Sequence, residues 1–220
     1  MAFKRYFHNN ATDATMAVAW AAALEEAIEY AGFDDLTVTE SSGLIQVFNG
    51  ESVSNDNIFV SYTVSSESSI TRYMDYAHNL TNVFGLYISV IATRHAVAFM
   101  GCVSDGTSNG GFVITKDTDG NYVILTNAGS TGIAYQSLDT PYILPRGSGL
   151  TTIPYLSVST DFTFAVTTLC NFPVPNDGST VKYLPHVFFC ITGQIQTDGD
   201  CIIDDTPYYC LGGKWYLIDT

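Results

Sequence analysis

The stretch Gly111-Phe-Val-Ile-Thr-Lys-Asp-Thr-Asp-Gly-Asn-Tyr-Val-Ile-Leu-Thr126 decides the fold class of this chain. Two runs of apolar and β-branched residues lie on either side of the pair Asp119-Gly120. An Asp-Gly pair between two such runs is the strongest short-range sequence signal for a β-hairpin. The sequence therefore predicts two antiparallel strands, over residues 111–116 and 121–126.

On the N-terminal side of this hairpin the chain has the same strand character. Short alternating or β-branched runs predict further strands at residues 36–39, 43–48, 57–64, 86–91 and 96–100. The segment 68–80 fits a helical face and a Ser/Thr-rich loop equally well. We therefore expect the N-terminal half to be mostly β.

One helix is predicted ahead of these strands. Apolar residues recur there at every fourth position, and they are Met16, Trp20, Leu24 and Ile28. Asp13 is the expected N-cap and Gly32 the expected C-terminal stop. The acidic residues of this segment mark its solvent side, at Glu25, Glu26 and Glu29. The many small alanine side chains predict close packing of the helix on a sheet, with Trp20 as its anchor.

On the C-terminal side of the hairpin, residues 127–154 are rich in Gly, Ser and Pro and are expected to form a connection or arm. Strand patterns resume at 155–158 and 161–169, and the Pro-rich segment 172–178 is expected to be a turn. Aromatic and β-branched runs then alternate with turn-forming pairs, at 187–192 and 201–220. We expect this last part to form a sheet that includes the final residues.

Together these patterns predict a mostly β protein with antiparallel sandwich or barrel-like sheets and one N-terminal α-helix packed on them. Roughly ten to twelve strands are expected. The predicted organisation is a helix and β-sheet region at 1–126, the connection or arm at 127–154 and a C-terminal β-sheet region at 155–220. One continuous domain could also hold all three parts.

The charge of the chain restricts its partners. Eight basic and 22 acidic residues give a formal net charge of −14, and the basic residues form no stripe or patch. Such a negative field repels nucleic-acid phosphates and anionic membranes, so we expect neither as a partner. No apolar run approaches 18 residues, and the N-terminal segment lacks the apolar core of a signal peptide. Synthesis in a cytoplasm, with reduced cysteines, is expected.

No metal site is predicted. The five cysteines, at positions 102, 170, 190, 201 and 210, have irregular spacing and no CxxC pair, which disfavours zinc. Asp117, Asp119 and Asn121 match the first three ligand positions of a calcium loop. Tyr122 stands where that loop needs glycine, so a hairpin turn is favoured.

A second acidic group lies near the end of the chain, at Asp198, Asp200, Asp204, Asp205 and Asp219. Carboxylates at strand ends could bind Ca²⁺, but aspartates at hairpin turns commonly bond the local backbone instead. The turn interpretation is favoured, so no metal and no other cofactor is predicted.

No catalytic residue is predicted either. The four histidines lie in different sequence contexts, and no GxSxG motif is present. His186 and Cys190 would share one strand face roughly 13 Å apart, which is too far for the histidine to act as a base. A pair of catalytic carboxylates, as in glycosidases, stays an open alternative only because any two of the 22 acidic residues could come together in the fold. We expect a protein that is not an enzyme.

The aromatic residues of the last strands, Tyr208, Tyr209, Trp215 and Tyr216, allow two interpretations. Exposed flat rings could stack on the sugar rings of a host-surface glycan. In an antiparallel sheet, however, about half of such rings face the core. The packing interpretation is favoured.

Several segments of this chain resemble uncharacterised structural proteins of tailed bacteriophage virions. They are the aromatic opening with Asn9-Asn-Ala-Thr12 and the Ala-rich helix, the hairpin at 112–127, and the closing segments 185–189 and 213–219. The resemblance implies a non-enzymatic component of the tail, neck or capsid surface, made in the bacterial host cytoplasm and located in the virion.

Such a component would act by self-association into a symmetric oligomer and by binding other virion proteins. The segment 127–155 is the expected arm that orders on assembly. The alternative is a receptor- or carbohydrate-binding module of a phage tail or tail fibre.

Overall fold

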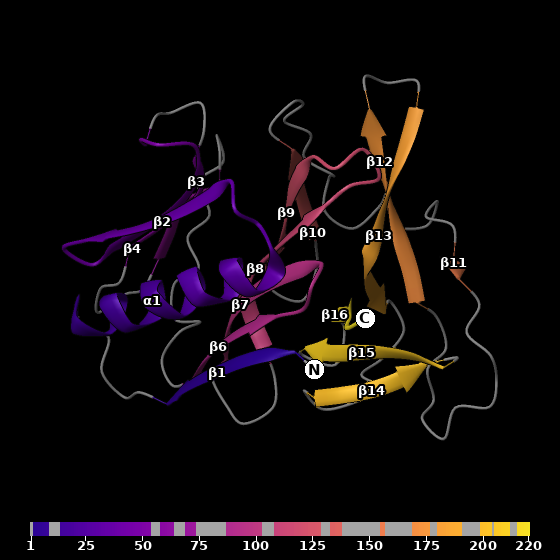
Figure 1. The fold of residues 1–220 in the computed structure, drawn as a ribbon, viewed down its shortest axis with the longest axis horizontal. Helices are drawn as coiled ribbons and strands as arrows, with labels where there is room; N and C mark the ends of the chain where they lie inside the picture. The colour runs from indigo at the N-terminus through magenta and orange to yellow at the C-terminus, as the bar shows by residue number, and fades with distance from the viewer. Residues whose placement is uncertain are drawn as a thin grey trace.

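The computed structural model describes residues 2–8, 14–53, 58–63, 69–73, 87–102, 108–128, 133–137, 155–156, 169–176, 180–190, 199–203, 205–211 and 215–220. These residues form one α-helix and sixteen β-strands in three antiparallel sheets (Figure 1). The predicted fold class, mostly β with an N-terminal helix packed on sheet strands, is confirmed. The number of strands is larger than the roughly ten to twelve predicted. Short strands form in the segment 68–80, for which a helix and a loop fitted equally well, and in the predicted connection 127–154.

Sheet A has six strands in the order β1-β6-β7-β8-β9-β10. Their bounds are β1 (Phe3–His8), β6 (Tyr87–Ala92), β7 (Ala96–Cys102), β8 (Ser108–Lys116), β9 (Tyr122–Ala128) and β10 (Ile133–Ser137). The predicted hairpin is confirmed, since β8 pairs with β9 and Lys116 lies opposite Tyr122. Strand β10 falls within the predicted connection 127–154 and pairs with β9.

Sheet B and the helix come from the same N-terminal part of the chain. The sheet order is β2-β3-β4-β5, with β2 (Leu36–Ser41), β3 (Leu44–Asn49), β4 (Ile58–Thr63) and β5 (Ser69–Tyr73). Helix α1 (Ala14–Ala31) precedes them, and the predicted N-cap Asp13 lies outside the described residues.

The helix ends at the predicted glycine. Gly32 has a φ of +69°, its N–H donates to the Glu29 carbonyl at 3.0 Å, and the Phe33 N–H donates to the Ile28 carbonyl at 3.1 Å. This pair of bonds is the Schellman motif, which needs a left-handed residue and therefore favours glycine. Phe33 is then buried in the same apolar cluster as Ile28, so the motif also sets the direction in which β2 starts.

Sheet C has six strands in the order β11-β12-β13-β16-β15-β14. Their bounds are β11 (Tyr155–Leu156), β12 (Leu169–Asn176), β13 (Thr180–Cys190), β14 (Gly199–Ile203), β15 (Thr206–Leu211) and β16 (Trp215–Ile218). The predicted strand 161–169 lies outside the described residues except for Leu169. Strand β16, the last in the chain, lies between β13 and β15.

The Pro-rich turn predicted at 172–178 is wrong for residues 172–176, which belong to β12. Pro173 and Pro175 lie opposite Tyr183 and Val181 of β13, after a register shift that follows Asn171. Within the described residues, β11 pairs with β12 only at the start of that strand, so the prolines lie where β12 has a single neighbour. An edge position tolerates residues that have no backbone N–H, which explains how a Pro-rich segment can be a strand.

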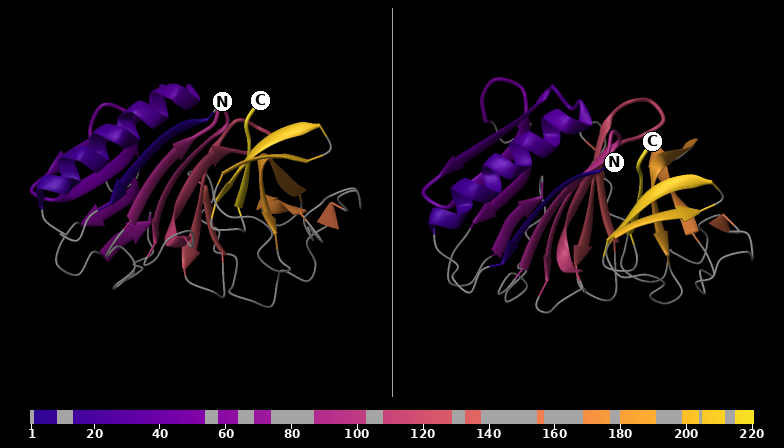
Figure 2. Two further views of the ribbon diagram at one scale, coloured as in Figure 1. Left: turned by 90° about the horizontal axis from the view of Figure 1, so that it is seen from below. Right: turned by 60° about the horizontal axis from the view of Figure 1, so that its bottom comes forward.

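The three sheets are arranged in layers, with α1 and sheet B on one side of sheet A and sheet C on the other (Figure 2). Alternate residues of the sheet A strands point to opposite faces. Phe99 and Phe112 belong to the cluster that contains α1, whereas Ala98 and Val113 point away from it, and all four are buried. Since β8 contacts β13, the second face is directed toward sheet C.

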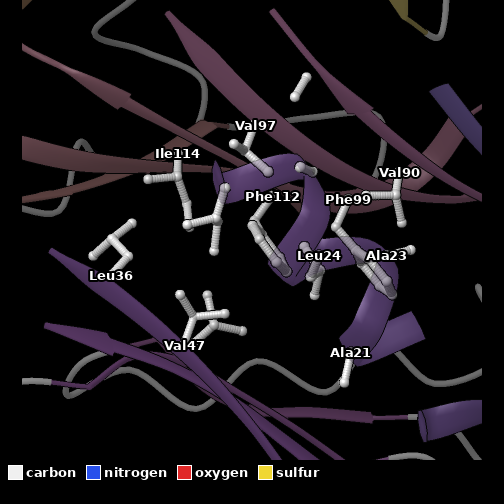
Figure 3. Packing of buried hydrophobic residues seen from close by; sticks show 14 of the residues in the cluster. Ala21, Ala23, Leu24, Leu36, Val47, Val90, Val97, Phe99, Phe112 and Ile114 are labelled. Carbon is white, nitrogen blue, oxygen red and sulfur yellow. The ribbon is translucent and has the colours of Figure 1, made fainter. Parts of the chain in front are cut away.

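The main apolar core lies between α1, sheet A and sheet B (Figure 3). Trp20, Leu24 and Ile28 are buried, while the three glutamates of the helix are exposed, so the predicted faces of α1 are confirmed. Trp20 meets Phe99 edge to face, with ring centroids 6.2 Å apart. Sheet B covers the same cluster through residues such as Leu36 and Val47. Both sheets therefore depend on α1 for their packing.

Candidate functional site: the junction between sheets A and C

Sheets A and C meet through a set of polar and aromatic side chains, which we call the A–C junction. It consists of Lys4, Tyr6, His95, His186, Asp200, Tyr209 and Thr220. Lys4 and Tyr6 come from the start of the chain, His95 from its middle and the other four residues from its C-terminal part. Figure 2 shows the corresponding strands side by side.

One half of the junction is centred on Lys4 of β1. Its Nζ donates to both carboxylate oxygens of Asp200 at 2.7 Å and lies 4.6 Å from the centroid of the Tyr209 ring. The hydroxyls of Tyr6 and Tyr209 form a hydrogen bond beside this ion pair. Tyr209 is buried, so Lys4 links an edge strand of sheet A to the packed interior of sheet C.

Replacing Lys4 by alanine is expected to lower the free energy of unfolding by about 1 kcal/mol, because a partly buried ion pair and a cation–π contact are lost together. Arg5→Ala is the matched control. Arg5 also makes an ion pair, with Glu26, and a cation–π contact, with Phe3. The Arg5 side chain is 53% exposed, whereas that of Lys4 is only 23% exposed, although its partner Asp200 is 63% exposed. Urea unfolding should show a smaller loss for Arg5→Ala; an equal or larger loss would contradict the role of Lys4 at the junction.

The other half of the junction is a pair of stacked imidazoles. The rings of His95 and His186 have centroids 3.9 Å apart and planes inclined by 15°. The Nε2 of His95 also lies 3.3 Å from the Oγ1 of Thr220. His95 is in the turn between β6 and β7, and His186 is in β13, so the stack joins the two sheets directly.

The turn that carries His95 is held in place by its own hydrogen bonds. The Thr93 N–H donates to the Ala96 carbonyl at 2.9 Å, and the Thr115 hydroxyl of β8 donates to the His95 carbonyl at 2.8 Å. Thr93 and Thr115 are both fully buried. The imidazole of His95 is therefore presented by a well-anchored backbone.

The environment of His186 favours its neutral form. Burial lowers the pKa of His186 below its ordinary value of 6.5, and the neighbouring His95 lowers it further. A charged imidazolium is disfavoured both by loss of water and by a second group that can become positive. His186 is therefore expected to be neutral in the stack at neutral pH.

The histidine pair is the feature that sequence reasoning missed. The four histidines lie in different sequence contexts, and the sequence suggests a neighbour for His186 only along its own strand, at Cys190. His95 and His186 are 91 positions apart (186 − 95), one in a turn and one in a strand, and no local pattern connects them. The side chain of Cys190 lies outside the described part of the chain.

The candidate calcium loop is a hairpin turn, as favoured from the sequence. The Oδ1 of Asp117 accepts the N–H groups of Asp119 and Asn121, both at 2.9 Å, and Gly120 has a φ of +85°. The Gly120 N–H donates to the Asp117 carbonyl at 3.0 Å. Aspartates in turns commonly accept hydrogen bonds from the backbone N–H groups of their own turn.

The C-terminal acidic group does not come together as a cluster among the described residues. Asp200 binds Lys4, Asp205 is an exposed turn residue with a φ of +62°, and Asp198 and Asp204 lie outside the described residues. Asp219 uses its N–H to donate to the Pro207 carbonyl at 2.9 Å. In the described ranges, no three His, Cys, Asp or Glu side chains are placed to hold a metal ion.

The aromatic residues considered as a sugar platform are largely in the core. Tyr208, Tyr209 and Tyr216 are all buried, and Tyr208 and Tyr216 meet at a ring-centroid distance of 6.4 Å. The side chain of Trp215 is not described. The three tyrosines thus present no exposed stacking surface, in agreement with the packing interpretation.

Two cysteines of sheet C, Cys201 and Cys210, pack in its apolar cluster. Cys210 is fully buried, and Cys201 is partly buried. Burial and the charge of Asp200 raise the pKa of Cys201 to about 11, so this thiol stays protonated at neutral pH. A protonated thiol is a weak nucleophile and packs as a small apolar side chain.

The outer strand of sheet C exposes an apolar side chain. Among the described strands, β14 pairs only with β15, and its Ile202 is 68% exposed. Strand β1, at an edge of sheet A, carries the two charged residues Lys4 and Arg5, whereas β14 carries one, Asp200, whose carboxylate binds Lys4. Charged residues protect a sheet edge from pairing with other chains, whereas an apolar edge favours such pairing.

Comparison of the chain with protein-family models, with curated proteins and with solved structures found no match. Within the part of the chain that the structure describes, no helix is long and apolar enough to cross a membrane.

Proposed function

We propose that this protein is a non-enzymatic structural component of a bacteriophage virion, a tail, neck or capsid-surface protein that works through subunit–subunit assembly. The observation that carries the proposal is the edge of β14, a strand with only one described neighbour, on which the Ile202 side chain is 68% exposed. Sheet edges of this kind bind a strand of another chain through backbone hydrogen bonds and apolar contacts. The sequence resemblance to virion proteins supports the same function.

Self-association should depend on this edge. Replacing Ile202 by lysine is expected to shift the protein toward monomers in analytical ultracentrifugation, because a charge on an edge strand opposes pairing. Val18→Lys is the matched control, since Val18 is 57% exposed on the outer face of α1 and lies on no sheet edge. Equal effects of the two substitutions, or a wild-type protein that stays monomeric at every concentration, would contradict assembly through β14.

The location in a virion requires a separate experiment. Mass spectrometry of purified phage particles, from cells that make this chain, should find it in a fixed copy number that reflects the particle symmetry. Its absence from particles would refute the virion function, even if the isolated protein forms oligomers.

The alternative, a receptor- or carbohydrate-binding module, has less support because Tyr208, Tyr209 and Tyr216 are buried. A glycan array with the purified protein tests it. Specific glycan binding by a particle-bound protein would favour the tail-fibre alternative over a purely structural role.

A further inference from the structure

We propose that the stacked imidazoles of His95 and His186 form an acid-sensitive contact, which weakens the junction between sheets A and C in mildly acidic solution. The inference concerns the fold of the single chain, so it does not depend on the proposed function. It rests on the geometry of the pair and on the elements that carry it.

The geometry makes simultaneous protonation of the two rings unfavourable. The ring centroids are only 3.9 Å apart. Two unit charges about 4 Å apart repel each other, and even with the dielectric constant of water this changes an equilibrium about fivefold. The repulsion is greater in a half-buried position, because the effective dielectric constant is lower there.

The repulsion acts across the junction and not within one sheet. His95 is held by the turn that follows β6, and His186 lies in the middle of a long strand of sheet C. The rings can therefore relieve the repulsion by separating the two sheets locally. Thr220, which contacts His95, belongs to the segment after β16 and would move with sheet C.

The charged residues of the junction and of the turn that carries His95 have partners of their own. The Arg94 guanidinium, next to His95, donates to the Tyr30 carbonyl at 2.8 Å and lies 4.3 Å from the Tyr30 ring centroid, toward α1. Lys4 and Asp200 bind each other at 2.7 Å. Asp219, beside Thr220, is half-buried and has contacts of its own.

The direction of the pH dependence follows from the lowered pKa of His186 in the folded state. As the pH falls from 6.5, the ordinary pKa of histidine, toward the lower pKa of His186 in the folded state, the unfolded chain binds more protons than the folded chain. The stack thus contributes its full stability above about pH 6.5 and loses it as the solution becomes more acidic. The loss depends on the contact between the rings, because burial and the neighbouring His95 both lower the pKa of His186 in the folded state.

Urea unfolding of the wild type and of His186→Phe between pH 7.5 and 5 tests the inference. Phenylalanine keeps a flat ring but cannot be protonated. The unfolding equilibrium constant of the wild type should rise at least about fivefold more than that of His186→Phe over this range. Parallel pH profiles of the wild type and His186→Phe would overturn the proposal.

NMR titration of the histidine ring protons gives an independent result that does not require the His186 variant to fold. In the wild type, His186 should titrate below its ordinary pKa, and His95→Phe should move that pKa upward, because one of its two causes is removed. Hydrogen exchange at β13 and β15 should become faster in the wild type at pH 5.5 than in His95→Phe, after correction for intrinsic rates. An ordinary pKa for His186 in the wild type, or unchanged exchange, would refute an acid-sensitive junction.

Discussion

Replacing Trp20 by alanine is expected to lower the free energy of unfolding by about 3–5 kcal/mol, which is a large part of the stability of an average domain. Trp20 is 1% exposed and packs edge to face on Phe99, so its removal leaves a cavity between α1 and sheet A. Alanine has the highest helix propensity, so the loss arises from packing and not from the helix itself. Urea denaturation followed by circular dichroism measures the effect.

Val18→Ala provides the control for this prediction on the same helix. Val18 is 57% exposed, so its truncation is expected to change the free energy of unfolding by less than about 0.5 kcal/mol. If both substitutions cost the same, or if Trp20→Ala has little effect, α1 is not the element that joins sheets A and B.

Removal of residues 215–220 is expected to abolish the folding of sheet C. Strand β16 lies between β13 and β15, and Leu217 is opposite Val187 on one side and Tyr209 on the other. Without β16, neither β14 nor β15 keeps a link to β13, and the buried side chains of Tyr216 and Leu217 are lost with it. Limited proteolysis should cleave the shortened chain rapidly within sheet C, and assembly should fail with it.

A chain that ends at Ile218 is the control for this truncation. It keeps all of β16 and loses the bond from Asp219 to Pro207 and the contact of Thr220 with His95. The loss of one backbone hydrogen bond costs about 1 kcal/mol, so protease resistance should be largely preserved. Rapid cleavage of both chains would show that the residues after β16, and not the strand, hold sheet C in place.

The local elements of this protein could be predicted because their signals lie within a few residues. The Asp119-Gly120 pair predicts the β8–β9 hairpin, since glycine tolerates the positive φ that the turn needs. The four-residue repeat of Trp20, Leu24 and Ile28 predicts the buried face of α1, and Gly32 predicts its end. Sequence reasoning failed where pairing partners decide the outcome, as in β12, where Pro173 and Pro175 are tolerated in a strand with one neighbour.

By itself, the sequence determined the mostly β fold class, the helix with its buried face and the main hairpin, because period and turn chemistry act locally. Only the tertiary structure decided the pairing of β1 with β6, the central position of β16 and the A–C junction. Lys4 and Asp200 are 196 positions apart, and His95 meets His186 across two sheets. Contacts of this kind depend on how whole sheets pack, so no short stretch of sequence can specify them.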